Sequence, residues 1–75
     1  MSEVKIKIEV GIDEFIGRQV KQTRLKKSVN QDELAGIMNI STMGLSLLEH
    51  GERRWKVHQL VRVARYLGVN FKLDV

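Results

Sequence analysis

The chain has 75 residues, enough for one small domain, and its formal net charge of +4 favours polyanionic partners. It contains no cysteine, which excludes disulfide staples and cysteine-based metal sites, and its two histidines lack metal-ligand spacing. No membrane-spanning apolar run and no signal segment is evident, so the expectation is a cytoplasmic protein without a cofactor and without membrane contact.

Alternation of apolar and charged residues predicts a β-strand over residues 3–10 at the start of the chain. Residues 12–27 have the spacing of an amphipathic helix, and Asp13 is expected to cap its N-terminus. The side chains expected to face the core from this helix are Ile12, Phe15, Ile16, Val20 and Thr23.

Two short helices are expected in the middle of the chain. Asn30 and Glu33 form a capping-box pattern that predicts a helix over residues 31–38, with Glu33 reaching back to the cap. Ser41 has the position of the next N-cap and predicts a helix over residues 42–49. The residues of these helices expected to face inward are Leu34, Ala35, Met38, Leu45 and Leu48.

A basic loop, Glu52-Arg53-Arg54-Trp55-Lys56, leads into the last predicted helix, over residues 56–67. Trp55 is expected to close the core over the start of this helix, and Tyr66 and Phe71 are expected in core or dimer packing. Residues 69–75 alternate apolar and polar side chains again and predict a second strand. The expected core positions of the last helix are Val57, Leu60, Val61, Ala64 and Leu67.

These elements predict a single domain over residues 1–75, mainly helical, with four or five helices and a short strand at each end. Because a lone strand pair would expose an apolar edge, the economical arrangement is an antiparallel sheet shared by two chains. Whether residues 3–10 pair within their own chain or with the partner is left open. The residues expected at this homodimer contact are Val69, Phe71, Leu73 and Val75.

The informative segment is the pair of helices over 31–38 and 42–49, joined by a turn that contains the apolar Ile40. This arrangement is typical of a helix-turn-helix, which lays its first helix across the DNA backbone and presents the second to the major groove. We call residues 42–49 the reading helix. The side chains expected to contact base edges, here called the reading face, are Thr42, Met43, Ser46 and Leu47.

Four short motifs stand in register over some 40 residues: Gln31-Asp32-Glu33-Leu34-Ala35, Ile40-Ser41, Leu45-Ser46-x-Leu48-Glu49-x-Gly51 and Leu60-Val61-x-Val63-Ala64-x-Tyr66-Leu67-Gly68-Val69. With these motifs, roughly residues 16–69 resemble the XRE-type helix-turn-helix family, the group of the lambda repressor, Cro and the 434 repressor. The resemblance implies a lambda-repressor-like fold and DNA binding.

The resemblance also implies roles for individual residues. Gln31 would grip a phosphate and brace the reading helix, and Arg24 would form an internal salt bridge with Glu49. Thr42 and Met43 would be the principal base-reading residues. Family members often carry Gln, Arg, Asn or Lys on the reading helix, and this chain carries none of them there. Direct readout would therefore depend on hydroxyls and apolar contacts, with DNA shape as a further source of specificity.

Phosphate contacts are expected from outside the two central helices. Residues 29–51 contain three acidic residues and no lysine or arginine, so all thirteen cationic side chains lie in the flanking segments. We expect the basic loop after the reading helix to clamp phosphates, whereas for Lys26 and Lys27 a solvated surface is an equal alternative. The full set of candidate phosphate-binding residues is Gln31, Ser41, Arg53, Arg54, Lys56, Lys26 and Lys27.

The sequence favours a repressor-type regulator that binds a pseudo-palindromic operator in double-stranded DNA as a homodimer. An enzyme is not expected, because no serine has a histidine and acid arrangement that would make it a nucleophile. Two alternatives stay open. Residues 67–75 resemble the terminal strand of HipB-type antitoxins, which implies a toxin partner, and Met43, Leu45 and Leu47 could instead bind an apolar groove of another protein.

Overall fold

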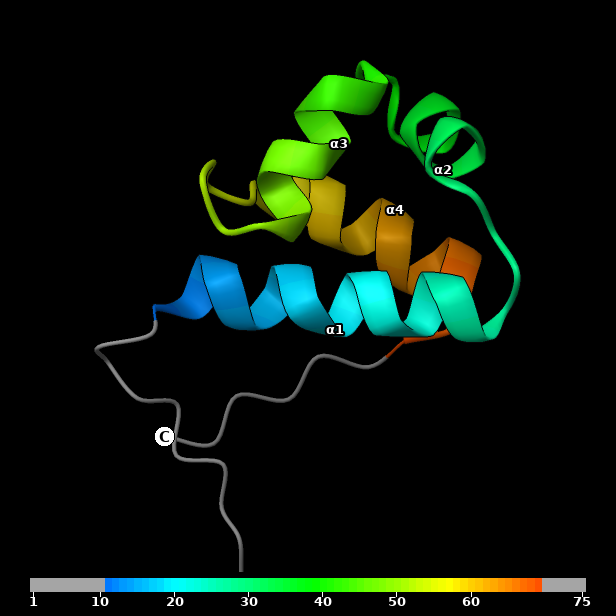
Figure 1. Cartoon of the computed structure of the whole chain (residues 1–75), viewed down its shortest axis with the longest axis horizontal. Helices are drawn as coiled ribbons and strands as arrows, with labels where there is room; N and C mark the ends of the chain where they lie inside the picture. Colours follow the sequence, from blue (N-terminus) through cyan, green and yellow to red (C-terminus); the bar gives the residue numbers. More distant parts are fainter. Residues whose placement is uncertain (1–10, 70–75) are drawn as a thin grey trace, which may run out of the picture.

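Four helices make up the fold of residues 11–69, the part of the chain that the computed structural model describes (Figure 1). The predicted mainly helical fold is confirmed for these residues. The predicted strand over residues 3–10 lies outside them, as does all but Val69 of the strand over 69–75, and Val69 is not in a strand. The helices are α1 (Ile12–Lys26), α2 (Gln31–Met38), α3 (Thr42–Glu49) and α4 (Val57–Leu67).

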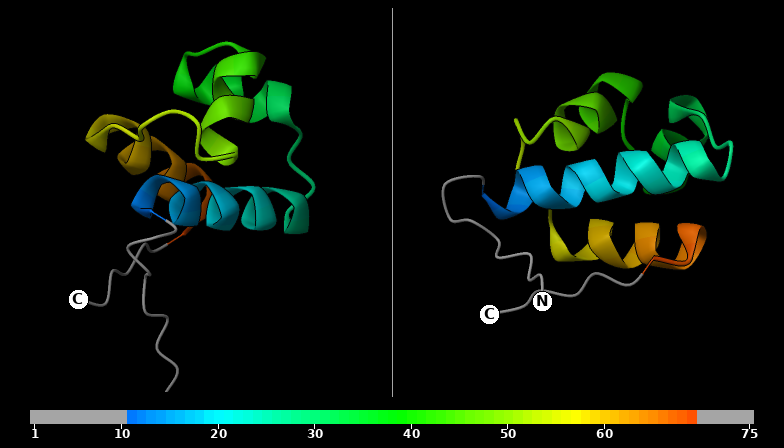
Figure 2. Two further views of the ribbon diagram at one scale, coloured as in Figure 1. Left: turned by 60° about the vertical axis from the view of Figure 1, so that its left-hand side comes forward. Right: turned by 60° about the horizontal axis from the view of Figure 1, so that its bottom comes forward.

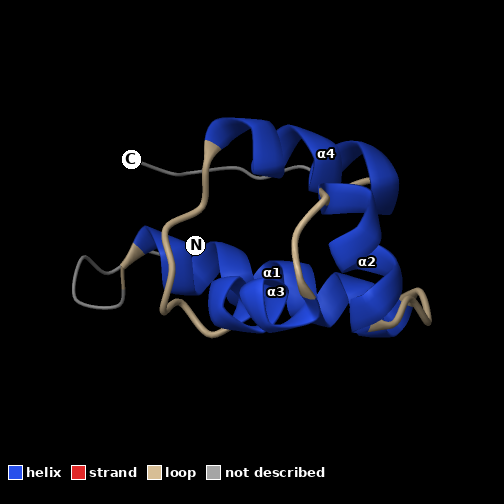
Figure 3. Ribbon diagram, turned by 90° about the horizontal axis from the view of Figure 1, so that it is seen from above, coloured by secondary structure: helices blue, strands red, loops and turns tan. Residues whose placement is uncertain are grey.

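The helices form two groups. Helices α2 and α3 lie together on one side of the molecule, above α1 and α4 in the orientation of Figure 1, and the two views of Figure 2 agree. Helix α3 packs against both α1 and α2, and α2 also packs against α4. Seen from above, α3 lies over α1 while α2 bridges toward α4 (Figure 3). The pair that carries the predicted reading face therefore rests on a helical platform.

A single core joins the four helices and the loop before α4. Trp55 is 6% exposed, as predicted, and its indole Nε1 donates to the backbone oxygen of Leu48 at 3.1 Å. This bond satisfies the polar atom of a buried aromatic ring and fixes the loop to the end of α3. The buried apolar residues are Ile16, Val20, Leu34, Ala35, Met38, Leu45, Leu48, Trp55, Val63 and Leu67.

The start of α1 differs from the prediction. Asp13 does not cap the helix, because the N-cap residue is Gly11, at φ 85°. The carboxylate Oδ1 of Asp13 instead accepts from the backbone N–H of Trp55 at 2.8 Å. Ile12, predicted to face the core, is 44% exposed at the first position of α1. Asp13 is thus a tie between α1 and the basic loop.

The predicted core stripe of α4 is correct only in part. Leu67 is buried and Leu60 packs against the core as predicted, whereas Val57 and Val61 are 75% and 42% exposed. The buried residues of the helix are Gln59, Val63 and Leu67, which lie one turn apart on the same face, and the side-chain oxygen of Gln59 accepts from the backbone N–H of Lys56 at 2.8 Å. Apolar spacing alone could not reveal a glutamine on the core side.

Tyr66 is exposed rather than part of the core, and its hydroxyl donates to the carboxylate of Glu33. The side chain of Glu33, expected to reach back to Asn30, instead binds Tyr66 and so joins α2 to α4. The bond to Glu33 raises the pKa of Tyr66 above its ordinary value of 10.0, with desolvation and the Glu33 charge acting in the same direction.

A titration tests this tie. Tyr66 is the only tyrosine, so its ionisation can be followed by ultraviolet absorbance. Because the pKa is raised on folding, its contribution to stability is fully present below about pH 10 and is lost as the pH rises through the folded pKa. We expect Glu33→Gln to return the pKa toward 10. Titration of the wild-type tyrosine at or below 10 would contradict the tie.

Candidate nucleic-acid interface

The turn between α2 and α3 is built from local capping interactions. Asn39 ends α2 in the left-handed conformation (φ 60°), which asparagine tolerates better than most residues. Ser41 then caps α3, accepting from the backbone N–H of Gly44 at 2.9 Å, and Asn30 caps α2 in the same way through Glu33 N–H at 2.8 Å. Both predicted caps are therefore present.

Helix α3 has two distinct faces. Leu45, Leu48 and Glu49 are buried where α3 packs against α1 and α2, and Gly44 is buried beside Arg53 and Ser41. Of the predicted reading face, Thr42 is exposed, Met43 is 71% exposed, and Ser46 and Leu47 are half-buried. The four residues thus occupy the side of α3 that the core leaves free.

Gly17 allows α1 and α3 to approach each other at backbone distance. A Cβ atom at Gly17 would lie 2.3 Å from the carbonyl oxygen of Leu48 and 2.6 Å from that of Glu49, much closer than real Cβ contacts. Sequence reasoning missed this position. The available signal was a glycine within a helical segment, where it lowers helix stability and so indicates a packing requirement.

A buried polar network holds the C-terminal end of α3. Arg24 and Glu49 are 5% and 4% exposed; Arg24 Nε donates to Glu49 Oε2 at 2.8 Å and Nη2 to Oε1 at 3.2 Å, a two-point ion pair. Arg24 Nη1 also donates to the backbone oxygen of Val29 at 3.0 Å. Gln31, at the start of α2, donates from Nε2 to Glu49 Oε1 at 3.0 Å. Helices α1, α2 and α3 are therefore joined at one carboxylate.

A second polar contact joins the exposed starts of α2 and α3. The hydroxyl of Thr42 donates to Asp32 Oδ1 at 2.7 Å, and both residues are exposed. Sequence reasoning gave Asp32 only a place at the positive end of α2, because no spacing rule indicates a contact between these positions. The first residue of the reading face is consequently held by an acidic side chain.

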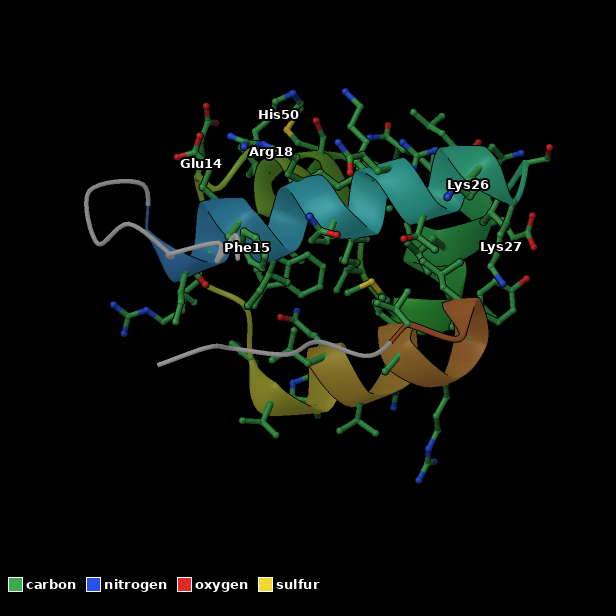
Figure 4. The ribbon with its side chains drawn as sticks, turned by 90° about the horizontal axis from the view of Figure 1, so that it is seen from below. Glu14, Phe15, Arg18, Lys26, Lys27 and His50 are labelled. Carbon is green, nitrogen blue, oxygen red and sulfur yellow. The ribbon has the colours of Figure 1, made fainter. Side chains whose placement is uncertain are left out.

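The cationic candidates fall into two groups. Arg53, Arg54 and Lys56 are exposed on the loop after α3, and the guanidinium of Arg53 reaches the start of α3, with Nη1 3.1 Å from where a Cβ of Gly44 would be. Lys26 and Lys27 are exposed at the end of α1; Lys27 lies beside the end of α4, its ammonium 3.7 Å from a Cβ position at Gly68 (Figure 4).

Glu14 and Arg18 form a local ion pair on the exposed surface of α1. Arg18 Nη2 lies 3.3 Å from Glu14 Oε2, in a solvent-exposed pair one helical turn apart. Figure 4 shows both side chains on the same side of α1 as His50, whose Nδ1 lies 2.8 Å from the backbone oxygen of Ser46. His50 is therefore bonded to its own helix end.

The expected dimer residues are only partly described. Val69 is half-buried and packs against the core of its own chain, with its backbone N–H donating to Ala64 at 3.1 Å. Phe71, Leu73 and Val75 lie outside the described residues. None of the helices between residues 11 and 69 is both long and apolar enough to cross a membrane.

Comparison with known proteins places this geometry among helix-turn-helix domains. The family described as Helix-turn-helix matches residues 20–73. Among solved structures, the chain is similar to the clp gene regulator ClgR from C. glutamicum, with a TM-score of 0.70 and 32% sequence identity. That similarity covers 75% of this chain and 72% of the other. No curated protein sequence matches the chain.

Proposed function

We infer that this chain, which belongs to the XRE-type helix-turn-helix family, represses transcription by occupying a pseudo-palindromic operator as a homodimer. The family and the likeness to a gene regulator make it a DNA-binding regulator of transcription. Repression, the symmetric operator, and dimer contact through Val69, Phe71, Leu73 and Val75 are the proposed parts. A cytoplasmic location stays a prediction.

The observation that carries the proposal is the free face of α3. Thr42 and Met43 are exposed at the start of the helix, where helix-turn-helix proteins contact base edges. The end of the same helix is fixed by the buried pair of Arg24 and Glu49. Because base contacts require the side chains to be held in a set register, a helix anchored in the core at its end, with solvent-exposed side chains at its start, suits sequence readout.

Affinity is proposed to come from the loop after α3. Helices α2 and α3 contain no lysine or arginine, so they supply no charge attraction to phosphates. Arg53 is the cation best placed for this role, because its guanidinium lies at the start of the reading helix. Arg54 and Lys56 extend the basic surface along the loop. Lys27 lies beside the end of α4 instead, which favours its reading as a solvated surface residue.

Binding to the DNA that flanks the protein's own gene tests the proposal, by fluorescence anisotropy over a salt series. We expect the natural flank to bind at least a hundredfold tighter than scrambled DNA, and Met43→Ala or Thr42→Ala to reduce that preference about tenfold. Arg53→Ala should weaken binding to all sequences and lower the salt slope by about 1. Lys27→Ala removes the same charge and should leave the slope unchanged.

Equal binding to flank and scrambled DNA, unaffected by the changes on α3, would mean that the reading face does not contact bases. The hypothesis that these residues bind another protein would then replace the hypothesis of a DNA-binding repressor. Equal effects of Arg53→Ala and Lys27→Ala would instead contradict the special placement of Arg53, and would assign phosphate binding to overall charge.

A second candidate is an antitoxin that neutralises a partner toxin and regulates its own operon. The observation that favours it is the apolar surface of α4, where Val57 and Val61 are exposed. Co-expression with the products of neighbouring genes separates the two readings. A stoichiometric complex that also binds the operator supports the antitoxin, whereas operator binding by the chain alone, with no partner recovered, supports the repressor.

A further inference from the structure

The contact between α2 and α3 at their exposed starts fixes the chemistry of one reading residue. The Thr42 hydroxyl donates to Asp32 Oδ1 over 2.7 Å, the short distance of a hydrogen bond to a charged acceptor. A threonine hydroxyl has a single hydrogen to donate and two lone pairs to accept with. The only donor of Thr42 is therefore directed at Asp32, and its remaining hydrogen-bonding capacity toward a ligand is that of an acceptor.

Asp32 is well supported in this position. It lies in the first turn of α2, where a negative charge is stabilised by the helix dipole. The cap of α2 is supplied by Asn30, so Asp32 is not needed for that role. Helices α2 and α3 also pack directly on each other, which keeps the carboxylate and the hydroxyl in register.

We propose that Asp32 is a specificity-determining positioning residue, which makes Thr42 select base edges that present a hydrogen-bond donor. The inference rests on the proposed function and assigns part of its specificity. In the major groove the amino groups of adenine and cytosine are donors, whereas guanine presents only acceptors and thymine an acceptor and a methyl group. Thr42 should therefore favour an adenine or cytosine at the base that it contacts, and disfavour guanine.

Asp32 has a second effect, on affinity. Its negative charge lies beside Thr42 at the start of α3, the end of the helix that contacts DNA in the proposed complex, and it opposes phosphate binding for every sequence alike. Replacing Asp32 should therefore strengthen binding to all DNA while weakening selection at one position. This opposite movement distinguishes a positioning role from general loss of structure, which would weaken both.

The experiment is selection of binding sites from a pool of random DNA duplexes by the full chain, followed by Kd measurement on the four variants of the position that Thr42 reads. For wild-type protein we expect a preference of roughly three- to tenfold for adenine or cytosine over guanine there, the effect of one hydrogen bond. Asp32→Ala frees the hydroxyl to donate, so this preference should disappear. Asp32→Asn keeps an acceptor oxygen and should retain the preference while binding all DNA more tightly.

A substitution at Thr42 provides the control for the effect of Asp32→Ala. Thr42→Val removes the hydroxyl at nearly constant shape, and in that background Asp32→Ala should leave base preference unchanged. A wild-type consensus that Asp32→Ala does not alter, or a change that persists in the Thr42→Val background, overturns the inference alone. A wild-type protein that enriches no sequence overturns the proposed function and this inference with it. Circular dichroism of each variant confirms that the helices are intact.

Discussion

Gly17→Ala is expected to destabilise the domain by about 3 kcal/mol or more, although alanine is the better helix former. The reason is the overlap of the new methyl group with the carbonyl oxygens of Leu48 and Glu49, at 2.3 and 2.6 Å. Backbone atoms cannot rotate away as a side chain can, so α1 and α3 must separate. Urea unfolding followed by circular dichroism measures the loss as a lower midpoint with an unchanged slope.

Gly36→Ala is the matched control for this substitution. Gly36 lies inside α2, and a Cβ there would meet no atom within 4 Å. The same chemical change should therefore stabilise the protein by roughly 0.5–1 kcal/mol, through helix propensity alone. If Gly17→Ala were as stable as wild type, the backbone contact between α1 and α3 would not be as close as described, whatever the result for Gly36.

Glu49→Ala should destabilise the domain by about 3–5 kcal/mol, because it leaves the guanidinium of Arg24 buried without its counter-charge. Arg24 is 5% exposed and makes two hydrogen bonds to the carboxylate that the substitution removes. Gln31 loses its acceptor as well. Native proteins are stable by only about 5–15 kcal/mol, so this loss is a large fraction of the total and should appear as a much lower midpoint in urea unfolding.

Two further variants separate burial from charge. Arg24→Met with Glu49→Leu removes both charges and fills the space, and should recover most of the stability that Glu49→Ala loses. Glu14→Ala breaks the exposed pair with Arg18, where both side chains are about half exposed, and should change stability by no more than about 1 kcal/mol. A similar loss from Glu14→Ala and Glu49→Ala would show that burial does not set the strength of these pairs.

Much of the fold could be predicted from the sequence, because caps and apolar spacing act locally. Asn30 and Ser41 accept the backbone hydrogen bonds expected of them, and Trp55 is in the core. On α4 the apolar spacing placed Leu67 in the core correctly but missed Gln59, which is buried with its side-chain oxygen bonded to the backbone of Lys56. A polar residue with a specific partner does not follow the apolar pattern on which the prediction depends.

The site divides in the same way. The reading face follows from helical spacing and the turn, and the structure places these residues on the free side of α3. The ties that hold the site, Gly17 against Leu48 and Asp32 against Thr42, join residues from different helices. Such contacts depend on how the helices are oriented in three dimensions. Their roles in DNA binding remain predictions.

The division of α3 into two faces has a consequence for engineering the protein. Leu45, Leu48 and Glu49 are buried against the other helices, whereas the side chain of Met43 is largely in solvent. Substitutions at exposed positions of this kind usually change stability by less than about 0.5 kcal/mol. New operator preferences could therefore be selected from libraries varied at Met43 and its exposed neighbour Thr42, with nearly all members folded.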